Sequence, residues 1–217
     1  MAKSEQYNEF RELINNKFSG DRLKSLNKMY DWYDKNDRMD APASGVAYYH
    51  NCFDGGYIDH ILRVHDNIHK MKKFYAVTGG MIDFTDEQAS FVSIHHDLGK
   101  LGSVEHPYYT KESDPYKIKN YSYYRKQEFD QYSSVNDLTL FMLQHFGVKY
   151  DRKEMISISL TDGLYIDDNK KYFIAHSIQH QMNTNLPYLS HWADHMATLV
   201  EKDAWYSVNK MGRFREE

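Results

Sequence analysis

The chain has 217 residues and a formal net charge of -4, with 41% hydrophobic and 27% charged residues. A chain of this length can bury a full core without disulfides, and its composition excludes a disordered protein. The slight acidic excess provides no basic field for duplex DNA, so we expect no duplex DNA among its partners.

Hydropathy and cysteine content indicate the cellular setting. The mean hydropathy is -0.77, and no apolar run approaches the roughly 18 residues of a membrane span. The first residues lack the apolar stretch of a secretion signal. Cys52 is the single cysteine, which excludes an internal disulfide framework and a cysteine-rich zinc site. We therefore expect a cytoplasmic protein with no membrane partner.

Apolar residues recur at helical spacing along most of the chain, which predicts an all-α fold. The first apolar stripe lies within residues 23–33, and a proline- and glycine-containing break follows at residues 41–45. We interpret residues 1–40 as an N-terminal helical extension, residues 41–205 as the main domain and residues 206–217 as a C-terminal tail.

Further helices are predicted by stripes and by start signals. Thr85 with Gln88 has the spacing of a capping box, and Asp151 with Glu154 resembles another helix start. Other apolar stripes run through residues 61–75, 135–145 and 186–200. The last of these stripes consists of Leu186, Leu189, Ala193, Met196 and Val200. Residues 102–132 lack such a stripe and are interpreted as a long loop or lid with one short helix.

The chain contains 12 histidines, and their helical positions separate inward from outward rings. His60 borders the apolar stripe of residues 61–75. His65 and His69 are rotated from His60 by about 140° and about 180°, so we expect both to face solvent. His191 and His195 also lie off the apolar face of their helix, which argues against a paired metal site there.

His96 continues an apolar stripe, so its ring is expected to point inward beside Asp97. Buried polar groups are costly unless they are paired. A divalent cation would pair both side chains, while a hydrogen bond that only holds the fold is the alternative. Asp194 lies beside Ala193 on the last stripe and needs a partner for the same reason.

Three segments in this order resemble the HD-domain superfamily of metal-dependent phosphohydrolases. They are Gly55-Gly56-Tyr57-Ile58-Asp59-His60, His95-His96-Asp97-Leu98-Gly99-Lys100 and Ala193-Asp194. The run from His96 to Lys100 is the most specific. Residues 41–51 also resemble the segment that leads into the domain in HD hydrolases of bacteriophages and bacteria. The resemblance covers roughly residues 42–200, most of the chain.

This resemblance implies an HD-domain helical bundle, with His60, His96, Asp97 and Asp194 as the metal ligands. It also implies hydrolysis of a phosphate ester or anhydride, in a nucleotide or a related small phosphate. Two histidines and two aspartates leave open positions on an octahedral ion, which suits Mn, Fe, Co, Ni or Mg. Asp97 would then take part in catalysis as a ligand of that ion.

Two-metal relatives carry additional histidines, and this chain has Asp137 and Thr161 at the corresponding positions. We therefore expect one ion per chain. Asp137, His145 and Asp162 are the candidates for a second ion or for support behind the first.

Lys100 follows the His-Asp pair and is expected to act in catalysis by meeting a substrate phosphate. A solvated lysine at a helix C-terminus is the alternative. In the loop that follows, tyrosines alternate with cations. Rings stack on bases and cations meet phosphates, so Tyr108, Tyr109 and Arg125 are predicted to bind substrate. The alternative is a loop that its tyrosines pack onto the core.

The resulting expectation is a metal-dependent phosphohydrolase that acts on a small phosphorylated substrate, a nucleotide or a related compound, by a metal-activated water. One alternative is a phosphodiesterase acting on cyclic nucleotides or RNA ends. The other is a degenerate HD module that binds a nucleotide or protein without turnover. The sequence indicates no oligomer interface.

Overall fold

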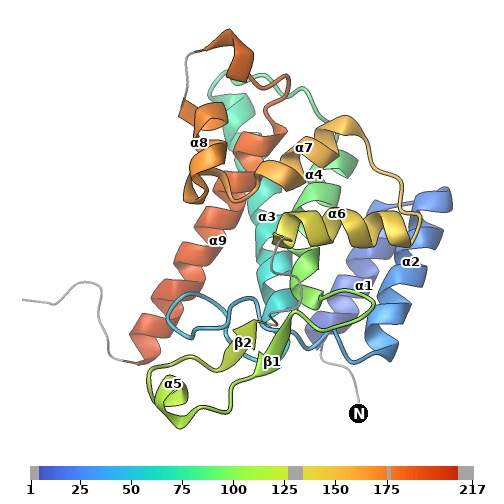
Figure 1. Cartoon of the computed structure of the whole chain (residues 1–217). Coiled ribbons are helices and arrows are strands. Elements are labelled where there is room, and N and C mark those ends of the chain that lie inside the picture. Colours follow the sequence, from blue (N-terminus) through green and yellow to red (C-terminus); the bar gives the residue numbers. More distant parts are fainter. Residues whose placement is uncertain (1–4, 127–133, 175–176, 210–217) are drawn as a thin grey trace, which may run out of the picture.

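The computed structural model describes residues 5–126, 134–174 and 177–209 (Figure 1). Over these ranges the fold is all-α with one two-stranded sheet, which confirms the predicted class. In chain order the α-helices are α1 (Glu5–Lys17), α2 (Gly20–Lys35), α3 (Gly56–Val77), α4 (Asp86–His95), α5 (Pro115–Lys119), α6 (Val135–His145), α7 (Arg152–Leu160), α8 (Asp167–Ile174) and α9 (Leu186–Val208). Short 3-10 helices cover Leu98–Leu101, Gly163–Tyr165 and Ile178–His180. Within the described ranges, no helix combines the length and apolarity that crossing a bilayer requires.

Two long helices form the centre of the molecule. Helices α3 and α9 lie side by side, with α4 against α3 and with α7 against both α4 and α9 (Figure 1). The predicted helix starts at Thr85 and Asp151 are confirmed, because each residue caps its helix in a complete capping box. Ser134 forms a third such box at the start of α6.

Helices α1 and α2 share the core of the rest of the chain. Phe10, Leu26 and Tyr30 have no exposed surface and belong to one continuous apolar cluster with Ile61 and Leu98. The break predicted at residues 41–45 separates α2 from α3 in sequence. The first two helices therefore gain their stability by packing against the segment interpreted as the main domain.

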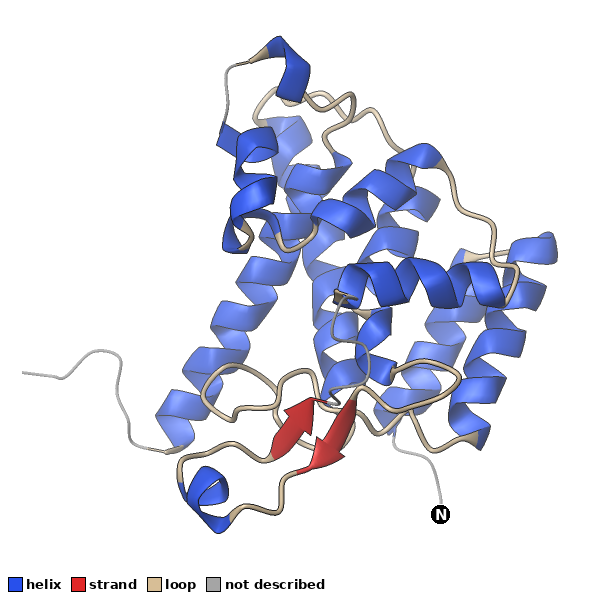
Figure 2. Cartoon of the chain, in the orientation of Figure 1, coloured by secondary structure: helices blue, strands red, loops and turns tan. Residues whose placement is uncertain are grey.

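The segment predicted as a loop with one short helix also contains a small hairpin. Strands β1 (Tyr109–Lys111) and β2 (Tyr124–Lys126) pair antiparallel, with α5 between them, and lie at one end of the bundle (Figure 2). An isolated bridge joins Val46 to Ser122. Strands of three residues are too short to give a readable alternation. Residues 127–132 of the predicted loop and 210–217 of the predicted tail lie outside the described residues.

The apolar stripe predicted for the last helix is wrong at its second half. Met196 and Val200 are each 46% exposed. The buried face of α9 instead consists of Leu186, Pro187, Leu189, Ser190, His191, Ala193, Ala197 and Glu201. Small and polar residues fill the buried turns where α9 meets α3, so the hydrophobic pattern misidentifies the face.

The outward position predicted for His191 is wrong, because this residue is buried, and those predicted for His65 and His69 are only partly right, because both are half-buried. Nε2 atoms of His65 and His69 lie 3.2 Å and 3.1 Å from the buried Oγ of Ser90 on α4. The buried Nδ1 of His191 lies 2.9 Å from the carbonyl oxygen of Thr161. Neighbouring helices pack against the faces of α3 and α9 that carry these histidines. The spacing of residues along one helix cannot predict such neighbours.

The partial burial of His65 makes the stability of the fold depend on pH. Burial first, and then His69 and Lys17, lower the pKa of His65 to about 3, below the value of about 6.5 in an unfolded chain. The unfolded chain therefore binds an extra proton between these values, and His65 destabilises the fold as the pH falls through this window. In urea titrations from about pH 7 to about pH 4, we expect His65→Gln to lose less unfolding free energy than wild type.

His145→Gln, which removes an imidazole at an exposed position, is the matched control. An unchanged pH dependence in His65→Gln would contradict the assignment.

Candidate metal centre

The four predicted ligands come from three places in the fold and meet at one buried point. His60 lies in the first turns of α3, His96 and Asp97 follow the end of α4, and Asp194 lies on α9. His60 has no exposed surface, and His96 is 2% exposed.

Glycines allow these elements to approach. Gly55, the residue directly before α3, has a φ of 85°, in the left-handed region that favours glycine. A Cβ on Gly56 would collide with the carbonyl oxygen of Asn51, and one on Gly99 with that of Val135. The glycines around the two motifs thus place His60 and the His-Asp pair close to their neighbours.

The side chains converge on one another. His60 Nε2 lies 3.1 Å from Asp194 Oδ1 and 3.6 Å from Asp97 Oδ2. His96 Nε2 lies 3.5 Å from Asp97 Oδ2 and 3.8 Å from Asp194 Oδ1. Two imidazole nitrogens therefore face the same two carboxylates.

The hydrogen bonds of the two rings show that this cluster fits a cation. His96 Nδ1 lies 3.0 Å from the carbonyl oxygen of Ser93, and His60 Nδ1 lies 3.0 Å from Glu201 Oε2. Both acceptors require a proton on Nδ1, which leaves a lone pair on Nε2 of the neutral ring. Both Nε2 atoms are buried and have no hydrogen-bond partner in the described residues. His60, His96 and Asp97 can therefore hold a metal ion, and Asp194 lies within reach of it.

Electrostatics at the centre favour cations. Burial opposes charge on His60, yet the Glu201 and Asp194 carboxylates raise its pKa to about 10 when no cation is bound. In that state a proton occupies Nε2 beside Asp194, and a metal ion would replace it. Burial likewise opposes the charge on Asp194, but contacts with His60 and His96 hold the pKa of that carboxyl well below its usual range. Lys100 Nζ lies 2.6 Å from Asp97 Oδ2, so this lysine is paired at the centre instead of being solvated.

A cavity of about 600 Å³ opens onto Asp97 and Asp194. The predicted substrate-binding residues Lys100, Tyr108 and Tyr109 line it. Its other polar and aromatic lining residues include Tyr49, His50, Lys126, Asp162, Tyr165 and Lys202.

Arg125 does not line this cavity. Its Nε donates to Thr110 Oγ1 at 3.1 Å on the exposed side of the hairpin. Successive residues of a strand face opposite sides, so the neighbouring Lys126 lines the cavity in its place.

The three candidates for a second ion lie in different environments. Asp162 lines the cavity and accepts from Asn136 Nδ2 at 2.9 Å. Burial first, and then Asp97 and Asp194, raise the pKa of Asp162. Asp137 accepts from Ser134 N at 3.0 Å as part of a helix cap, and His145 is exposed at the end of α6. Only Asp162 among these three candidates shares the cavity with the predicted ligands.

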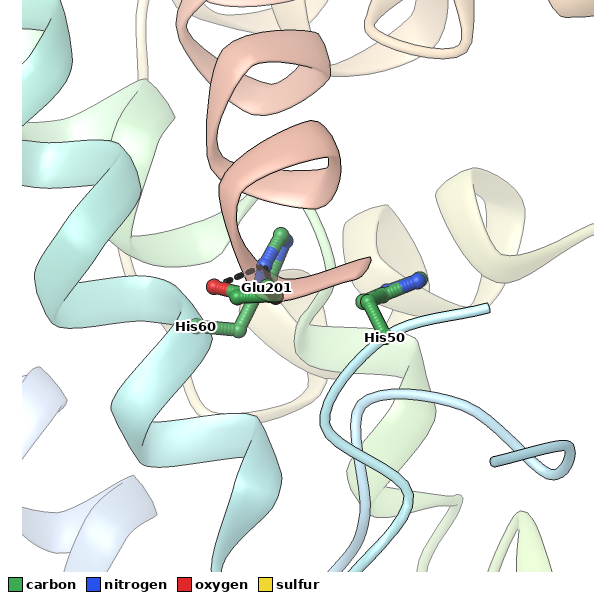
Figure 3. A group of neighbouring side chains, drawn as sticks. All are labelled: His50, His60 and Glu201. Atoms are coloured by element: carbon green, nitrogen blue, oxygen red, sulfur yellow. Dashed lines mark hydrogen bonds and ion pairs between the residues drawn. The ribbon is translucent and has the colours of Figure 1, made fainter. Parts of the chain in front are cut away.

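Two side chains beside His60 were not predicted to belong to the site. Figure 3 shows His50, on the chain leading into α3, and Glu201, on α9, around the His60 ring. Both ring nitrogens of His50 are buried without a hydrogen-bond partner in the described residues, and the ring centroid lies 5.0 Å from that of His60. Glu201 follows Asp194 by seven residues, two helical turns, which places both on one face of α9. This seven-residue spacing was the feature of the sequence from which Glu201 could have been predicted to lie near the site.

None of the family models, curated proteins or solved structures compared with this chain matches it. Functional inference therefore depends on the chain's own residues and on their arrangement.

Loss of one ligand should weaken metal binding strongly. We expect His96→Ala to bind Mn²⁺ more than about 100-fold more weakly than wild type, because residues behind metal ligands already contribute about 10- to 100-fold. Isothermal titration calorimetry measures this difference. His145→Ala, at an exposed position, should bind as wild type does. Wild-type affinity in His96→Ala would exclude this residue as a ligand.

Proposed function

We propose that the chain is a metal-dependent phosphohydrolase of the HD type that cleaves a phosphate ester or anhydride. The proposed substrate is a nucleotide or a related small phosphate. The observation that carries this proposal is the pair of buried Nε2 atoms of His60 and His96, which face the Asp97 and Asp194 carboxylates at a cavity and lack a hydrogen bond within the described residues. The resemblance of the same residues to the HD pattern supports it independently of the geometry.

The proposed cofactor is one Mn, Fe, Co, Ni or Mg ion per chain, held by His60, His96, Asp97 and Asp194. Two nitrogens and two carboxylates leave positions open to substrate and water, as a hydrolytic site requires. When bound, such an ion polarises a phosphoryl oxygen and lowers the pKa of water.

The charges around the cavity favour an anionic substrate. Lys100, Lys126 and Lys202 line it together with three aspartates, Asp97, Asp162 and Asp194. These charges balance when all six groups are ionised, so a divalent cation makes the lining net positive. Lysines act as point charges toward phosphate. Lys100, already beside Asp97, is placed to hold a phosphoryl oxygen next to the ligands.

The aromatic lining supports a base-containing substrate. The rings of Tyr108 and Tyr109 lie 4.8 Å apart at their centroids, in an edge-to-face arrangement. Lys126 Nζ lies 5.7 Å from the centroid of the Tyr108 ring. Rings of this kind stack on bases while neighbouring cations meet phosphates. In this account Tyr108 and Tyr109 hold the base, and the lysines orient the phosphate.

A turnover screen tests the proposed function. Wild-type protein with Mn²⁺ or Co²⁺ is incubated with deoxynucleoside triphosphates, nucleoside monophosphates, cyclic dinucleotides and short RNA. We expect phosphate or nucleotide release from at least one of these, and none from His96→Ala. Turnover of cyclic dinucleotides or RNA ends alone would indicate the phosphodiesterase alternative. Binding without any turnover would indicate a degenerate module and contradict the hydrolase.

Substitution of the cavity lysine should separate substrate handling from metal binding. For a substrate identified in the screen, we expect Lys100→Met to lower kcat/KM by about 100-fold, the typical cost of losing one charge-stabilising donor. Bound metal should remain at the wild-type level, measured by elemental analysis. Lys119→Met, at an exposed position on α5, is the matched control. Unchanged kcat/KM in Lys100→Met would remove this lysine from the mechanism.

A further inference from the structure

A buried glutamate lies directly behind the first predicted ligand. The side chain of Glu201 has no exposed surface. Buried glutamates are rare unless they are paired. Both carboxylate oxygens of Glu201 face His60 Nδ1, at 3.2 Å and 3.0 Å (Figure 3). The pairing thus joins α9 to α3 at the ring that the metal centre needs.

This contact determines which nitrogen of His60 is available as a ligand. An ionised carboxylate only accepts hydrogen bonds, so Nδ1 of His60 must donate. The neutral ring has a single N–H, and its Nε2 then keeps the lone pair that faces Asp97 and Asp194. A carboxylate that accepts from Nδ1 also raises the basicity of the ring, so Nε2 binds a cation more strongly.

Glu201 is itself held in place by an arginine. Arg63 Nε donates to Glu201 Oε1 at 3.1 Å. The Arg63 guanidinium lies 3.6 Å from Asp59, one helical turn earlier on α3. Asp59 in turn accepts from Asn51 at 2.7 Å and from Gln6 at 3.0 Å. The contacts reach from α1 through α3 to the buried carboxylate, and Glu201 cannot rotate without losing its bonds to Arg63 and His60.

The same atoms fit a second cation poorly. His50, His60 and Glu201 each offer a ligand atom, and these atoms lie within 4.8 Å of one another. However, Glu201 Oε1 already accepts from Arg63, and His60 Nδ1 carries a proton toward Glu201. A cation there would meet the arginine charge at close range and would have to displace that proton. The geometry therefore favours an orienting role for Glu201.

We propose that Glu201 is a positioning residue that, anchored by Arg63, fixes the His60 ring with Nε2 toward the metal centre. This inference rests on the proposed function. Partners of this kind behind a metal ligand typically contribute about 10- to 100-fold to metal affinity. Glu201→Gln keeps the size of the side chain and an acceptor for Nδ1 but removes the charge.

The chain offers a matched control in Glu154. Its side chain is also fully buried and is bonded to an arginine, with Arg22 Nη1 at 2.8 Å from Oε1. It lies on α7 and does not line the cavity. Glu154→Gln therefore reproduces the loss of a buried, arginine-paired charge away from the proposed centre.

The test measures Mn²⁺ affinity by calorimetry and the visible absorption of bound Co²⁺ in wild type and both glutamine variants. We expect Glu201→Gln to bind Mn²⁺ about 10-fold more weakly and to shift the Co²⁺ band, because the band reports on ligand strength. Glu154→Gln should lower the melting temperature while keeping wild-type affinity and spectrum. Arg63→Met removes the anchor of Glu201 at a part-exposed position and should weaken Mn²⁺ binding by less than Glu201→Gln does. This variant tests the same contact if Glu201→Gln fails to fold.

The outcomes separate the two proposals. Wild-type affinity and spectrum in Glu201→Gln would overturn the positioning role and leave the proposed function intact. Equal weakening in Glu154→Gln would also overturn it, since the effect would then be general. A wild-type protein that binds neither Mn²⁺ nor Co²⁺ would overturn both, because there would be no ligand for Glu201 to position.

Discussion

The arrangement of the molecule depends on a buried point where two imidazole nitrogens face two carboxylates. His60, His96, Asp97 and Asp194 bring lone pairs and negative charge together in a largely buried place. Buried polar groups of this kind destabilise a fold unless a cation or proton joins them. Three packing features bring these side chains together. They are the contact of α3 with α9, the glycine before the start of α3 and the close approach of Gly99 to α6.

Around that point the charges are arranged in layers. The inner layer consists of the four predicted ligands. Behind it, Glu201 and the Ser93 carbonyl fix the proton positions of the two rings. In front of it, the cavity lining balances three lysines against three aspartates. A divalent cation in the inner layer would make the net charge of the site positive and so favour binding of phosphate. This charge links the proposed cofactor to the proposed substrate.

The sequence predicts those parts of the site that local spacing determines. His96 was expected to point inward because it continues an apolar stripe, and its ring is buried. Spacing does not report what lies across from a helix, so it misplaced His191 and did not predict the partial burial of His65. The sequence does not predict Glu201 as part of the site, because a glutamate in a long helix normally faces solvent. Arg125 was predicted to bind substrate because cations alternate with tyrosines in its segment, but that pattern does not tell which side of a three-residue strand faces the cavity.

The most direct test of this account is anomalous diffraction from crystals of the protein grown with Mn²⁺. We predict one anomalous peak per chain, bounded by Nε2 of His60, Nε2 of His96 and the carboxylates of Asp97 and Asp194. The absence of a peak at this position, or two peaks within the cavity, would contradict it.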